Sequence, residues 1–588
     1  MASRDTIYLN TAVDLVTRMR RVALLLGAAI TALAATLDDV CTATYAKAAI
    51  PKNGILSGVT FNTSSISVSV TKNASVTGTD FPSGVIDYCS VAFSYSHQGA
   101  GDTVQLEFWL PAPDKFANRW LSTGGGAFAI NSGTNSLPGG IIYNAAAGIT
   151  DGGFGGFDNE LDDVFPVGNG TANWPAVYMF GYQAHHEMSV IGKAFTRSFF
   201  NMSAAEKLYS YYQGCSEGGR EGWSQLQRFA DEWDGAVTGA PAIRFSQQQI
   251  NHMFPPVVEK TMGYYPPPCE LEQIMYETID ACDALDGRTD GVVSRTDLCK
   301  LNFNLSSLIG IPYSCNATSA LTGYEPAQNG TITAEGVALA EAIFKGLHDS
   351  NGLRAYLSFQ YGTSLDDATT VYDETTNSWT ASTSVNGGTE WIARFIELQE
   401  TSNLDWSNFT YDTLRDYMYI GWQMYEDTLQ TTWPDLSATR DAGVKIIHYH
   451  GESDPSIPPA SSVHYHESVR SILYPDLSFN ESTARLNEWY RLFLVPGGAH
   501  CAVNPYQDGP WPQTTLGSLI EWVEQGVVPE RLNATYTSGS DAGSEAQLCA
   551  WPLRPLWSDN ATKFDCVYDQ ASIDTWNYHF DSYKEPLY

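Results

Sequence analysis

The chain has few basic residues. Its 588 residues include 32 Lys and Arg against 66 Asp and Glu, which gives a formal net charge of -34. So acidic a protein repels the phosphates of nucleic acids and the headgroups of anionic lipids. We therefore expect neither a nucleic acid nor a membrane among its partners, and nothing in the sequence indicates an oligomeric state.

The sequence also lacks internal repeats, low-complexity tracts and Cys-x-x-Cys pairs. The first two absences argue against solenoid and fibrous folds, and the third removes the usual pattern of a zinc site. The ten cysteines are an even number. In an exported protein they are expected to form disulfides.

An apolar run long enough to cross a membrane is missing as well. The stretch 22–35 has about 14 residues, whereas a spanning helix needs about 20. It follows Met19-Arg20-Arg21 and ends near the small-residue cleavage signal Ala32-Leu33-Ala34, as in a secretory signal peptide. We predict a signal peptide over residues 1–35, with Met19 as a second candidate start, and a secreted, extracellular protein. A membrane anchor is the alternative.

Export also agrees with the sequons for N-linked glycosylation. They stand at Asn62, Asn73, Asn169, Asn201, Asn304, Asn316, Asn329, Asn408, Asn480, Asn533 and Asn560.

The length predicts more than one structural unit, because a single hydrophobic core rarely exceeds about 250 to 300 residues. Strand-like and helix-like segments alternate over residues 36–243 and 442–588, which predicts the α/β class. Residues 244–441 differ, with the run Pro266-Pro267-Pro268, an aspartate-rich stretch and several amphipathic helical patterns. We predict a discontinuous catalytic core interrupted by a large inserted lid domain.

The pattern Gly214-x-Ser216-x-Gly218 places a serine between a predicted strand and a predicted helix. A short apolar and aromatic run, 208–212, precedes it, and apolar residues recur at helical spacing over 223–233. In this context the pattern carries a nucleophilic serine, because side chains on its flanks would clash in the strained turn. The N-terminus of the helix would favour negative charge beside the serine.

A serine nucleophile needs a base, and Asp454 and His500 follow Ser216 in the order found in α/β-hydrolases. Both stand in loops after predicted strands, 444–450 and 492–495, as polar residues do at the carboxyl ends of parallel strands. We predict that His500 takes the serine proton and that Asp454 orients the imidazole.

Other residues compete for these roles. His500 could be a structural loop histidine, and Asp508 is a rival for the carboxylate. His448 and His450 lie inside a predicted strand. We interpret them as core residues or as support for the site.

The glycine-rich stretch 123–127 resembles the loop that gives one N–H to an oxyanion in such sites, the residue after the nucleophile giving the other. We therefore predict an oxyanion hole from Glu217, Gly125 and Gly126. A flexible glycine turn is the alternative.

Two cysteines flank the predicted nucleophile and base. Cys215 precedes Ser216 and Cys501 follows His500. Bridged cysteines hold their Cα atoms roughly 5.5 Å apart. If these two form a disulfide, it holds the serine and the histidine together.

The loop 282–292 contains Asp283, Asp286 and Asp290 with two glycines. Carboxylates and backbone carbonyls suit Ca²⁺, which takes about six to eight oxygen ligands. The spacing is not that of an EF-hand, and a solvated acidic loop is the alternative.

The pieces Gly214-Cys215-Ser216-Glu217-Gly218-Gly219-Arg220, Asp454 and His500-Cys501 resemble the tannase/feruloyl esterase family, and its secreted fungal members most. The resemblance covers essentially the whole mature chain. The stretches that look like the fungal tannases of this family are 266–271, 282–305, 448–458 and 551–557.

The resemblance implies an α/β-hydrolase core, with a lid inserted between the serine and the aspartate and a calcium site in that lid. Carried onto this sequence, the calcium ligands would be the side chains of Asp283, Asp286 and Asp290 and the backbone carbonyls of Arg288 and Val292.

The resemblance also implies the disulfide Cys215–Cys501 and suggests the disulfide Cys282–Cys299. For the other cysteines we predict the pairs Cys41–Cys89, Cys549–Cys566 and, by elimination, Cys269–Cys315. One feature departs from some fungal members, which carry a dibasic processing site in the lid. No Lys-Arg pair follows Cys315 here. We therefore do not expect cleavage into two chains.

The activity that the resemblance implies is hydrolysis of galloyl ester and depside bonds in hydrolysable tannins, with release of gallic acid through an acyl-enzyme. The first alternative is a feruloyl, or cinnamoyl, esterase acting on plant cell-wall esters. The second is a binding protein with this fold and no turnover. Trp391, Tyr419 and Trp422 are candidates for an acyl pocket, with packing inside the lid as their other interpretation.

Overall fold

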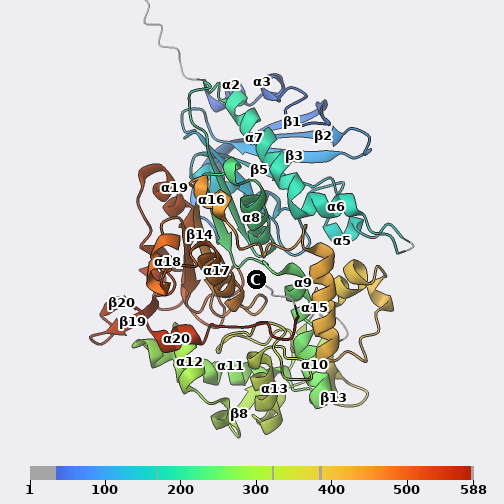
Figure 1. Cartoon of the computed structure of the whole chain (residues 1–588), viewed down its shortest axis with the longest axis vertical. Coiled ribbons are helices and arrows are strands. Elements are labelled where there is room, and N and C mark those ends of the chain that lie inside the picture. Colours follow the sequence, from blue (N-terminus) through green and yellow to red (C-terminus); the bar gives the residue numbers. More distant parts are fainter. Residues whose placement is uncertain (1–34, 169, 321–322, 383–386, 585–588) are drawn as a thin grey trace, which may run out of the picture.

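The computed structural model of the chain describes residues 35–168, 170–320, 323–382 and 387–584 (Figure 1). The predicted signal peptide lies outside these residues except for its last position, and so does the sequon asparagine Asn169.

A nine-stranded mixed sheet runs through the molecule. The pairs β1–β2, β2–β3 and β3–β5 are antiparallel, and the remaining pairs, from β5–β4 to β14–β15, are parallel. The spatial order is β1 (Val59–Val76), β2 (Gly84–His97), β3 (Val104–Leu110), β5 (Ala145–Thr150), β4 (Arg119–Thr123), β6 (Tyr209–Cys215), β7 (Gly235–Gly239), β14 (Lys445–Gly451) and β15 (Tyr490–Val495).

Helices cover both faces of this sheet, as its buried parallel strands require. One face packs against α7 (Ala184–Phe199), α8 (Glu217–Arg228) and α17 (Ala460–Leu473), and the other against α4 (Pro138–Ile142) and α19 (Thr515–Gln525). Successive strand residues alternate between the faces, so Tyr212 joins the cluster around α8 and Tyr211 the cluster around α19. The predicted α/β class is confirmed. No helix in the described residues has the length and apolar character needed to cross a bilayer.

A long insertion separates two neighbouring strands. β7 pairs with β14 in parallel although residues 240–444 lie between them. The inserted residues form helices and two-stranded sheets that gather at the opposite end of the molecule from β1 to β3 (Figure 1). This is the position at which the sequence predicts the lid. Its main helices are α9 (Phe245–Asn251), α10 (Phe254–Met262), α11 (Pro268–Cys282), α12 (Thr296–Asn302), α13 (Ala334–Lys345) and α15 (Tyr411–Tyr425). The last helix of the insertion, α16 (Ser437–Asp441), instead lies beside α8 of the core (Figure 1).

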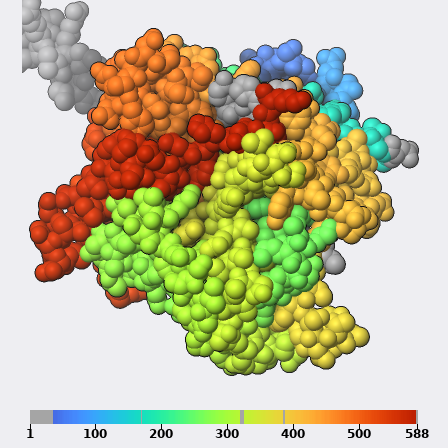
Figure 2. Space-filling view, turned by 60° about the horizontal axis from the view of Figure 1, so that its bottom comes forward, coloured from blue at the N-terminus to red at the C-terminus, as the bar shows by residue number. Residues whose placement is uncertain are grey.

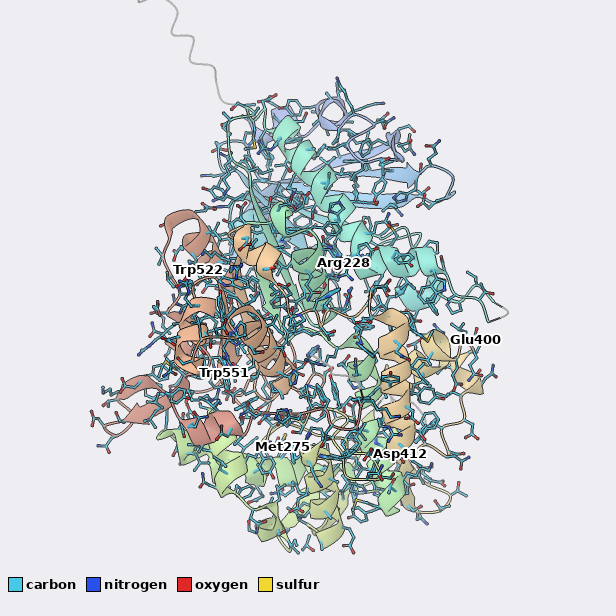
Figure 3. The ribbon with its side chains drawn as sticks, viewed as in Figure 1. Arg228, Met275, Glu400, Asp412, Trp522 and Trp551 are labelled. Carbon is cyan, nitrogen blue, oxygen red and sulfur yellow. A yellow bond between two sulfur atoms is a disulfide. The ribbon has the colours of Figure 1, made fainter. Side chains whose placement is uncertain are left out.

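The C-terminal part returns to the lid. After the strands β17 (Arg531–Tyr536), β18 (Glu545–Cys549), β19 (Arg554–Ser558) and β20 (Lys563–Val567), the helix α20 (Gln570–Asp574) packs against α12. Arg295 of the lid pairs with Asp569 at 3.0 Å. In Figure 2 the C-terminal residues, in red, run across the surface between core and lid. Figure 3 labels Trp551 on the core side and Met275 on the lid side.

Five disulfides link the described residues, and they are the five predicted pairs. No cysteine in the described part of the chain is free.

Candidate active site

Ser216 stands on a strained turn between β6 and α8. Its φ of 63° and ψ of -126° are rare for a residue other than glycine. The chain packs tightly around it. A Cβ on Gly214 would lie 2.5 Å from the carbonyl oxygen of Gly218, and one on Gly218 would lie 2.7 Å from the carbonyl oxygen of Gly125. The glycines of the pattern are therefore needed by backbone contact.

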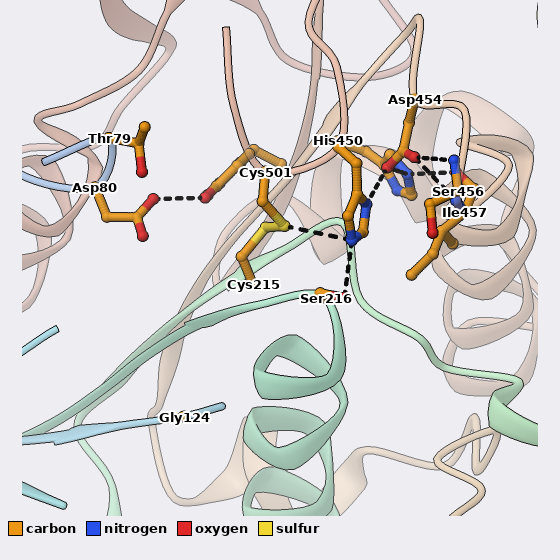
Figure 4. Close-up of a disulfide and its surroundings, with 12 residues drawn as sticks. Thr79, Asp80, Gly124, Cys215, Ser216, His450, Asp454, Ser456, Ile457 and Cys501 are labelled. Carbon is orange, nitrogen blue, oxygen red and sulfur yellow. Dashed lines mark hydrogen bonds and ion pairs between the residues drawn. A yellow bond between two sulfur atoms is a disulfide. The ribbon is translucent and has the colours of Figure 1, made fainter. Parts of the chain in front are cut away.

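The structure brings the predicted serine, histidine and aspartate together; Figure 4 labels Ser216 and Asp454. His500 Nε2 lies 2.8 Å from Ser216 Oγ, and His500 Nδ1 lies 2.8 Å from Asp454 Oδ2. Because Nδ1 faces a carboxylate, it carries the ring proton, which leaves Nε2 to accept from the serine hydroxyl. The rival Asp508 is exposed, and its carboxylate lies against Gly539 instead.

Asp454 is fully buried and remains ionised. Its Oδ1 accepts the backbone N–H groups of Ser456 at 2.8 Å and Ile457 at 2.9 Å. Burial alone would raise its pKa, but the charge of His500 and the hydrogen bonds from His450 and His500 outweigh burial and hold the pKa well below its ordinary value. The imidazole at His500 therefore faces a permanent negative charge.

The disulfide between Cys215 and Cys501 joins the residue before the serine to the residue after the histidine, with the Cα atoms 6.0 Å apart. The backbone at Cys501 is in the left-handed region, with φ 55°. Two turns that are both uncommon for L-residues are thus held together by a covalent bond (Figure 4).

The predicted oxyanion donors need a correction. The N–H of Gly125 already donates to Glu221 Oε2 at 2.9 Å, and that of Gly126 donates to the carbonyl of Ala129 at 3.0 Å. Neither is free for an oxyanion. The N–H of Glu217, at the first position of α8, has no acceptor among the described residues, so the structure keeps only this donor of the three.

The side chain that holds Gly125 is itself unusual. Glu221 is buried beneath the glycine loop, where Tyr212 also donates to it at 3.3 Å. Burial raises the pKa of Glu221 to about 8. Burial, and then the charge of Glu221, also raise the pKa of Glu217 well above its ordinary value. Of these two acids, Glu221 accepts the N–H of the glycine loop, whereas the carboxylate of Glu217 pairs with Arg220.

A cavity of about 1120 Å³ opens over Ser216 and His500. One wall comes from the core and is rich in hydroxyl and amide groups, in residues 75–81, 132 and 135–136. The other wall comes from the lid, where the polar residues are Gln248, Gln249, His252, Asp366, Asp367 and Glu390.

The polar groups of the lid wall orient one another. His252 Nδ1 lies 2.7 Å from Asp367 Oδ2, and its Nε2 lies 2.7 Å from the side-chain amide of Gln248. Burial opposes charge on the ring, but the carboxylate of Asp367 raises the pKa of His252. Sequence reasoning missed these residues, although Gln248 and His252 have the spacing of one helical face.

The aromatic candidates for the pocket pack elsewhere in the described structure. Trp391 is fully buried, and its ring centroid lies 4.8 Å from that of Phe395 and 5.2 Å from that of Phe245. Tyr419 and Trp422 contact each other, with centroids 5.7 Å apart. None of the three lines the cavity.

In the acidic loop of the lid, backbone N–H groups of the loop itself supply some of the hydrogen bonds that the carboxylates need. Asp283 accepts the N–H groups of Asp290 at 3.0 Å and Gly291 at 2.9 Å, and Asp286 Oδ1 accepts that of Arg288 at 2.9 Å. Asp286 Oδ2 and Asp290 Oδ1 are buried without a hydrogen-bond partner. Burial raises the pKa of each of these two carboxyls to about 6. A bound cation would satisfy these oxygens.

The side chains alone do not form a finished metal site. In the described part of the chain, no three His, Cys, Asp or Glu side chains converge as metal ligands do. Backbone carbonyls would have to complete a coordination sphere at this loop.

Known proteins match this chain over nearly its whole length. A model of the family described as tannase and feruloyl esterase matches residues 89–573. The tannase of Aspergillus oryzae is 50% identical over 94% of this chain and 97% of its own. The probable feruloyl esterase of Arthroderma benhamiae is 33% identical over 84% of this chain and 88% of its own.

A solved structure agrees. The tannin acyl hydrolase from Aspergillus niger superposes with a TM-score of 0.92 at 54% identity, covering 94% of this chain and 99% of that one. Together with the serine turn and the order of the three polar residues, this confirms the α/β-hydrolase fold. The chain therefore belongs to the tannase and feruloyl esterase family, whose members are carboxylic ester hydrolases.

Proposed function

We propose that the protein is a secreted serine esterase that hydrolyses galloyl ester and depside bonds of hydrolysable tannins and releases gallic acid. The line Ser216, His500 and Asp454 at the base of the cavity carries the proposal of an esterase. The galloyl substrate is supported by the identity with the tannase of Aspergillus oryzae.

In the first half of the reaction Ser216 Oγ attacks the ester carbonyl while its proton passes to His500 Nε2. The tetrahedral intermediate carries a negative oxygen, which the free N–H of Glu217 and the N-terminus of α8 stabilise. Collapse of the intermediate breaks the bond to the alcohol, and His500 returns the proton to the departing alkoxide. The galloyl group remains on the serine as an ester.

In the second half a water replaces the alcohol. His500 takes a proton from this water, hydroxide adds to the acyl carbonyl, and the proton returns to Ser216 Oγ as the acid leaves. Asp454 stays ionised throughout and stabilises the imidazolium that forms twice in each cycle.

Specificity for a galloyl ring is argued from the lid wall of the cavity. A ring with three hydroxyls can exchange hydrogen bonds with the amides of Gln248 and Gln249 and with the pair His252 and Asp367. A methoxylated ring would leave some of these groups unpaired, which a polar site penalises strongly. Feruloyl esters are the second candidate substrate, favoured by the relatives of that name.

The test compares initial rates on methyl gallate and methyl ferulate, with Ser216→Ala as the control. A preference for gallate that is lost in Ser216→Ala supports the proposal, and a preference for ferulate overturns the substrate while keeping the mechanism. Labelling of Ser216 by a fluorophosphonate distinguishes an esterase from a binding protein, which would not react.

We also propose a structural Ca²⁺ at the acidic loop of the lid. The side chains of Asp283, Asp286 and Asp290 and the carbonyls of Arg288 and Val292 would hold it. The two unpaired buried carboxylate oxygens support this proposal, since a divalent cation would offset their charge. The ion would hold the loop that the disulfide Cys282–Cys299 closes.

Secretion is proposed from the signal-peptide pattern and agrees with the five disulfides. Expression of the full chain in a eukaryotic host should give a protein in the medium whose N-terminus lies near residue 35. Retention in the cell membrane would instead support the anchor.

A further inference from the structure

A second imidazole contacts the buried carboxylate of Asp454. His450, on β14, is fully buried, and its Nε2 lies 3.1 Å from Asp454 Oδ2 and 3.0 Å from the carbonyl oxygen of Ile457. Both of these atoms can only accept a hydrogen bond while Asp454 is ionised. His450 Nε2 therefore carries a hydrogen and donates it to this pair of oxygens (Figure 4).

The other nitrogen of His450 continues into a chain of polar side chains. Nδ1 lies 2.6 Å from Ser462 Oγ, the same hydroxyl lies 2.7 Å from His448 Nε2, and His448 Nδ1 lies 2.8 Å from the hydroxyl of Tyr490. With both rings neutral, every bond has one donor and one acceptor. Tyr490 donates to His448, His448 to Ser462, Ser462 to His450, and His450 to Asp454.

The neutral state of the His448 ring has a physical basis. Burial, and then the charge that its histidine neighbours can carry, hold the pKa of His448 well below its ordinary value. His450 shares Asp454 Oδ2 with His500, which becomes an imidazolium during the reaction. A second cation at the same oxygen would oppose that charge, whereas a neutral N–H donor does not.

The two oxygens of Asp454 are thereby fully used. Oδ1 accepts two backbone N–H groups, and Oδ2 accepts from His450 and His500. Because the carboxylate is fully buried, protein groups must supply all of its hydrogen bonds. Without His450, only His500 would remain on Oδ2.

We propose that His450 is a positioning residue for the reaction, and that the chain from Tyr490 through His448 and Ser462 fixes its ring so that an N–H always points at Asp454. The carboxylate is then held in line with His500 Nδ1 before the substrate arrives. This inference rests on the proposed roles of Ser216, His500 and Asp454.

In the described structure, the titratable groups that face this chain are His448 on β14 itself, Tyr490 on β15, and Tyr465, His466 and Glu467 on α17. The His466 ring lies edge-on to that of Tyr490 with centroids 4.9 Å apart, and the charges of Tyr465 and Glu467 act on Tyr490. The charge of Asp454 also reaches His252 on the lid wall. A substitution at His450 should therefore change mainly the protonation and the position of His500 and Asp454.

The experiment compares His450→Phe, which removes the donor, with His450→Gln, whose amide N–H can occupy the place of Nε2. For His450→Phe we expect kcat on methyl gallate to fall about 10- to 100-fold, the effect of losing one hydrogen bond to a charged group, with KM within about threefold. His450→Gln should recover most of that loss. The matched control is His186→Gln, a histidine of α7 outside this hydrogen-bonded chain whose ring stacks on Phe229 with centroids 3.8 Å apart, and it should keep kcat within about threefold.

Two further measurements separate positioning from a merely structural role. A carboxylate that has lost a donor attracts the imidazolium proton of His500 more strongly, so the acid limb of kcat/KM should move to higher pH in His450→Phe but not in the control His186→Gln. The low-field NMR signal of the proton between His500 and Asp454 should shift or broaden in His450→Phe without any substrate. If that variant does not fold, Ser462→Ala tests the same chain and should lower kcat several-fold with a shift of the same signal.

Wild-type kcat, acid limb and NMR signal in the folded His450→Phe or in Ser462→Ala would overturn the inference. So would an equal loss in His450→Phe and His450→Gln with an unchanged acid limb, because that pattern indicates damage to packing. Failure of the proposed function has a different signature, namely wild-type protein that hydrolyses no ester and does not react with a fluorophosphonate at Ser216.

Discussion

Removing the disulfide between Cys215 and Cys501 should affect catalysis more than substrate binding. The change is Cys215→Ala with Cys501→Ala. The bond connects the turn of the nucleophile directly to the loop of His500, and the Cys501 backbone sits in the left-handed region at φ 55°. Without the bond, this loop can relax toward ordinary backbone angles and carry His500 away from Ser216.

The structure sets the size of both effects. The two cysteines are 286 residues apart, and for a loop of that length the chain-entropy relation gives roughly 5–6 kcal/mol as an upper limit on the loss of unfolding free energy. For catalysis, His500 Nε2 lies 2.8 Å from Ser216 Oγ, and a displacement of about 1 Å can cost about 100-fold in rate. We expect kcat to fall about 10- to 100-fold and KM to change less than about threefold, because the cavity walls come from other elements.

The assay is initial-rate hydrolysis of methyl gallate at a temperature where circular dichroism shows each variant folded. Cys549→Ala with Cys566→Ala is the matched control, since it removes a disulfide with a sequence separation of 17 that joins β18 to β20. The control should lower the melting temperature and leave kcat within about twofold.

Wild-type kcat in the folded Cys215→Ala/Cys501→Ala protein would refute the reasoning. An equal fall of kcat in the control would attribute the loss to general instability. Treatment of the wild type with a reductant should reproduce the double variant, provided that the bond is shown to be open by thiol labelling.

Three further predictions follow from charge and burial. Burial raises the pKa of Glu221 to about 8, so the wild type should lose stability as pH rises from about 4.5 to 8. Over that range Glu221→Gln should gain about 5 kcal/mol in unfolding free energy relative to the wild type; equal pH profiles in chemical denaturation would contradict this. His97 bonds to Asp102 at 2.6 Å and Glu187 at 3.0 Å, which raise its pKa against the effect of burial. In the same denaturation experiment His97→Gln should therefore lower the unfolding free energy at pH 5 and lower it progressively less as pH rises from about 6.5 through the raised pKa. Removal of the ion from the acidic loop with EGTA should lower the melting temperature, and Ca²⁺ at about 100 times its Kd should restore about 2.7 kcal/mol of unfolding free energy. Asp286→Asn should abolish this response. Calorimetric traces that are identical with and without Ca²⁺ would refute the ion site.

The serine, aspartate and histidine could be found in the sequence because each carries a local signal. The turn at Ser216 has no room for side chains at Gly214 and Gly218. The two glycines in the sequence therefore indicate this close backbone contact. The order of the three residues along the chain and the strands before them supplied the rest.

The oxyanion donors could not be found in the same way. Whether the N–H of Gly125 is free depends on Glu221, a residue 96 positions further along the chain. A glycine-rich stretch shows only that the backbone can approach closely, not which acceptor it meets. The lid wall was missed for the same reason, since Gln248, His252 and Asp367 meet only after the lid has folded.

The inserted lid has a consequence for how the chain reaches its native state. During synthesis β6, α8 and β7 emerge with Ser216, but their neighbour β14 and the loop of His500 emerge only after residues 240–444. The edge of β7 therefore stays unpaired until β14 has been synthesised. Pairing the two strands then closes a loop of residues 240–444, and the entropy lost in closing so long a loop makes this step slow. A chain that ends before β14 should therefore be left with the edge of β7 unpaired, which is a template for aggregation.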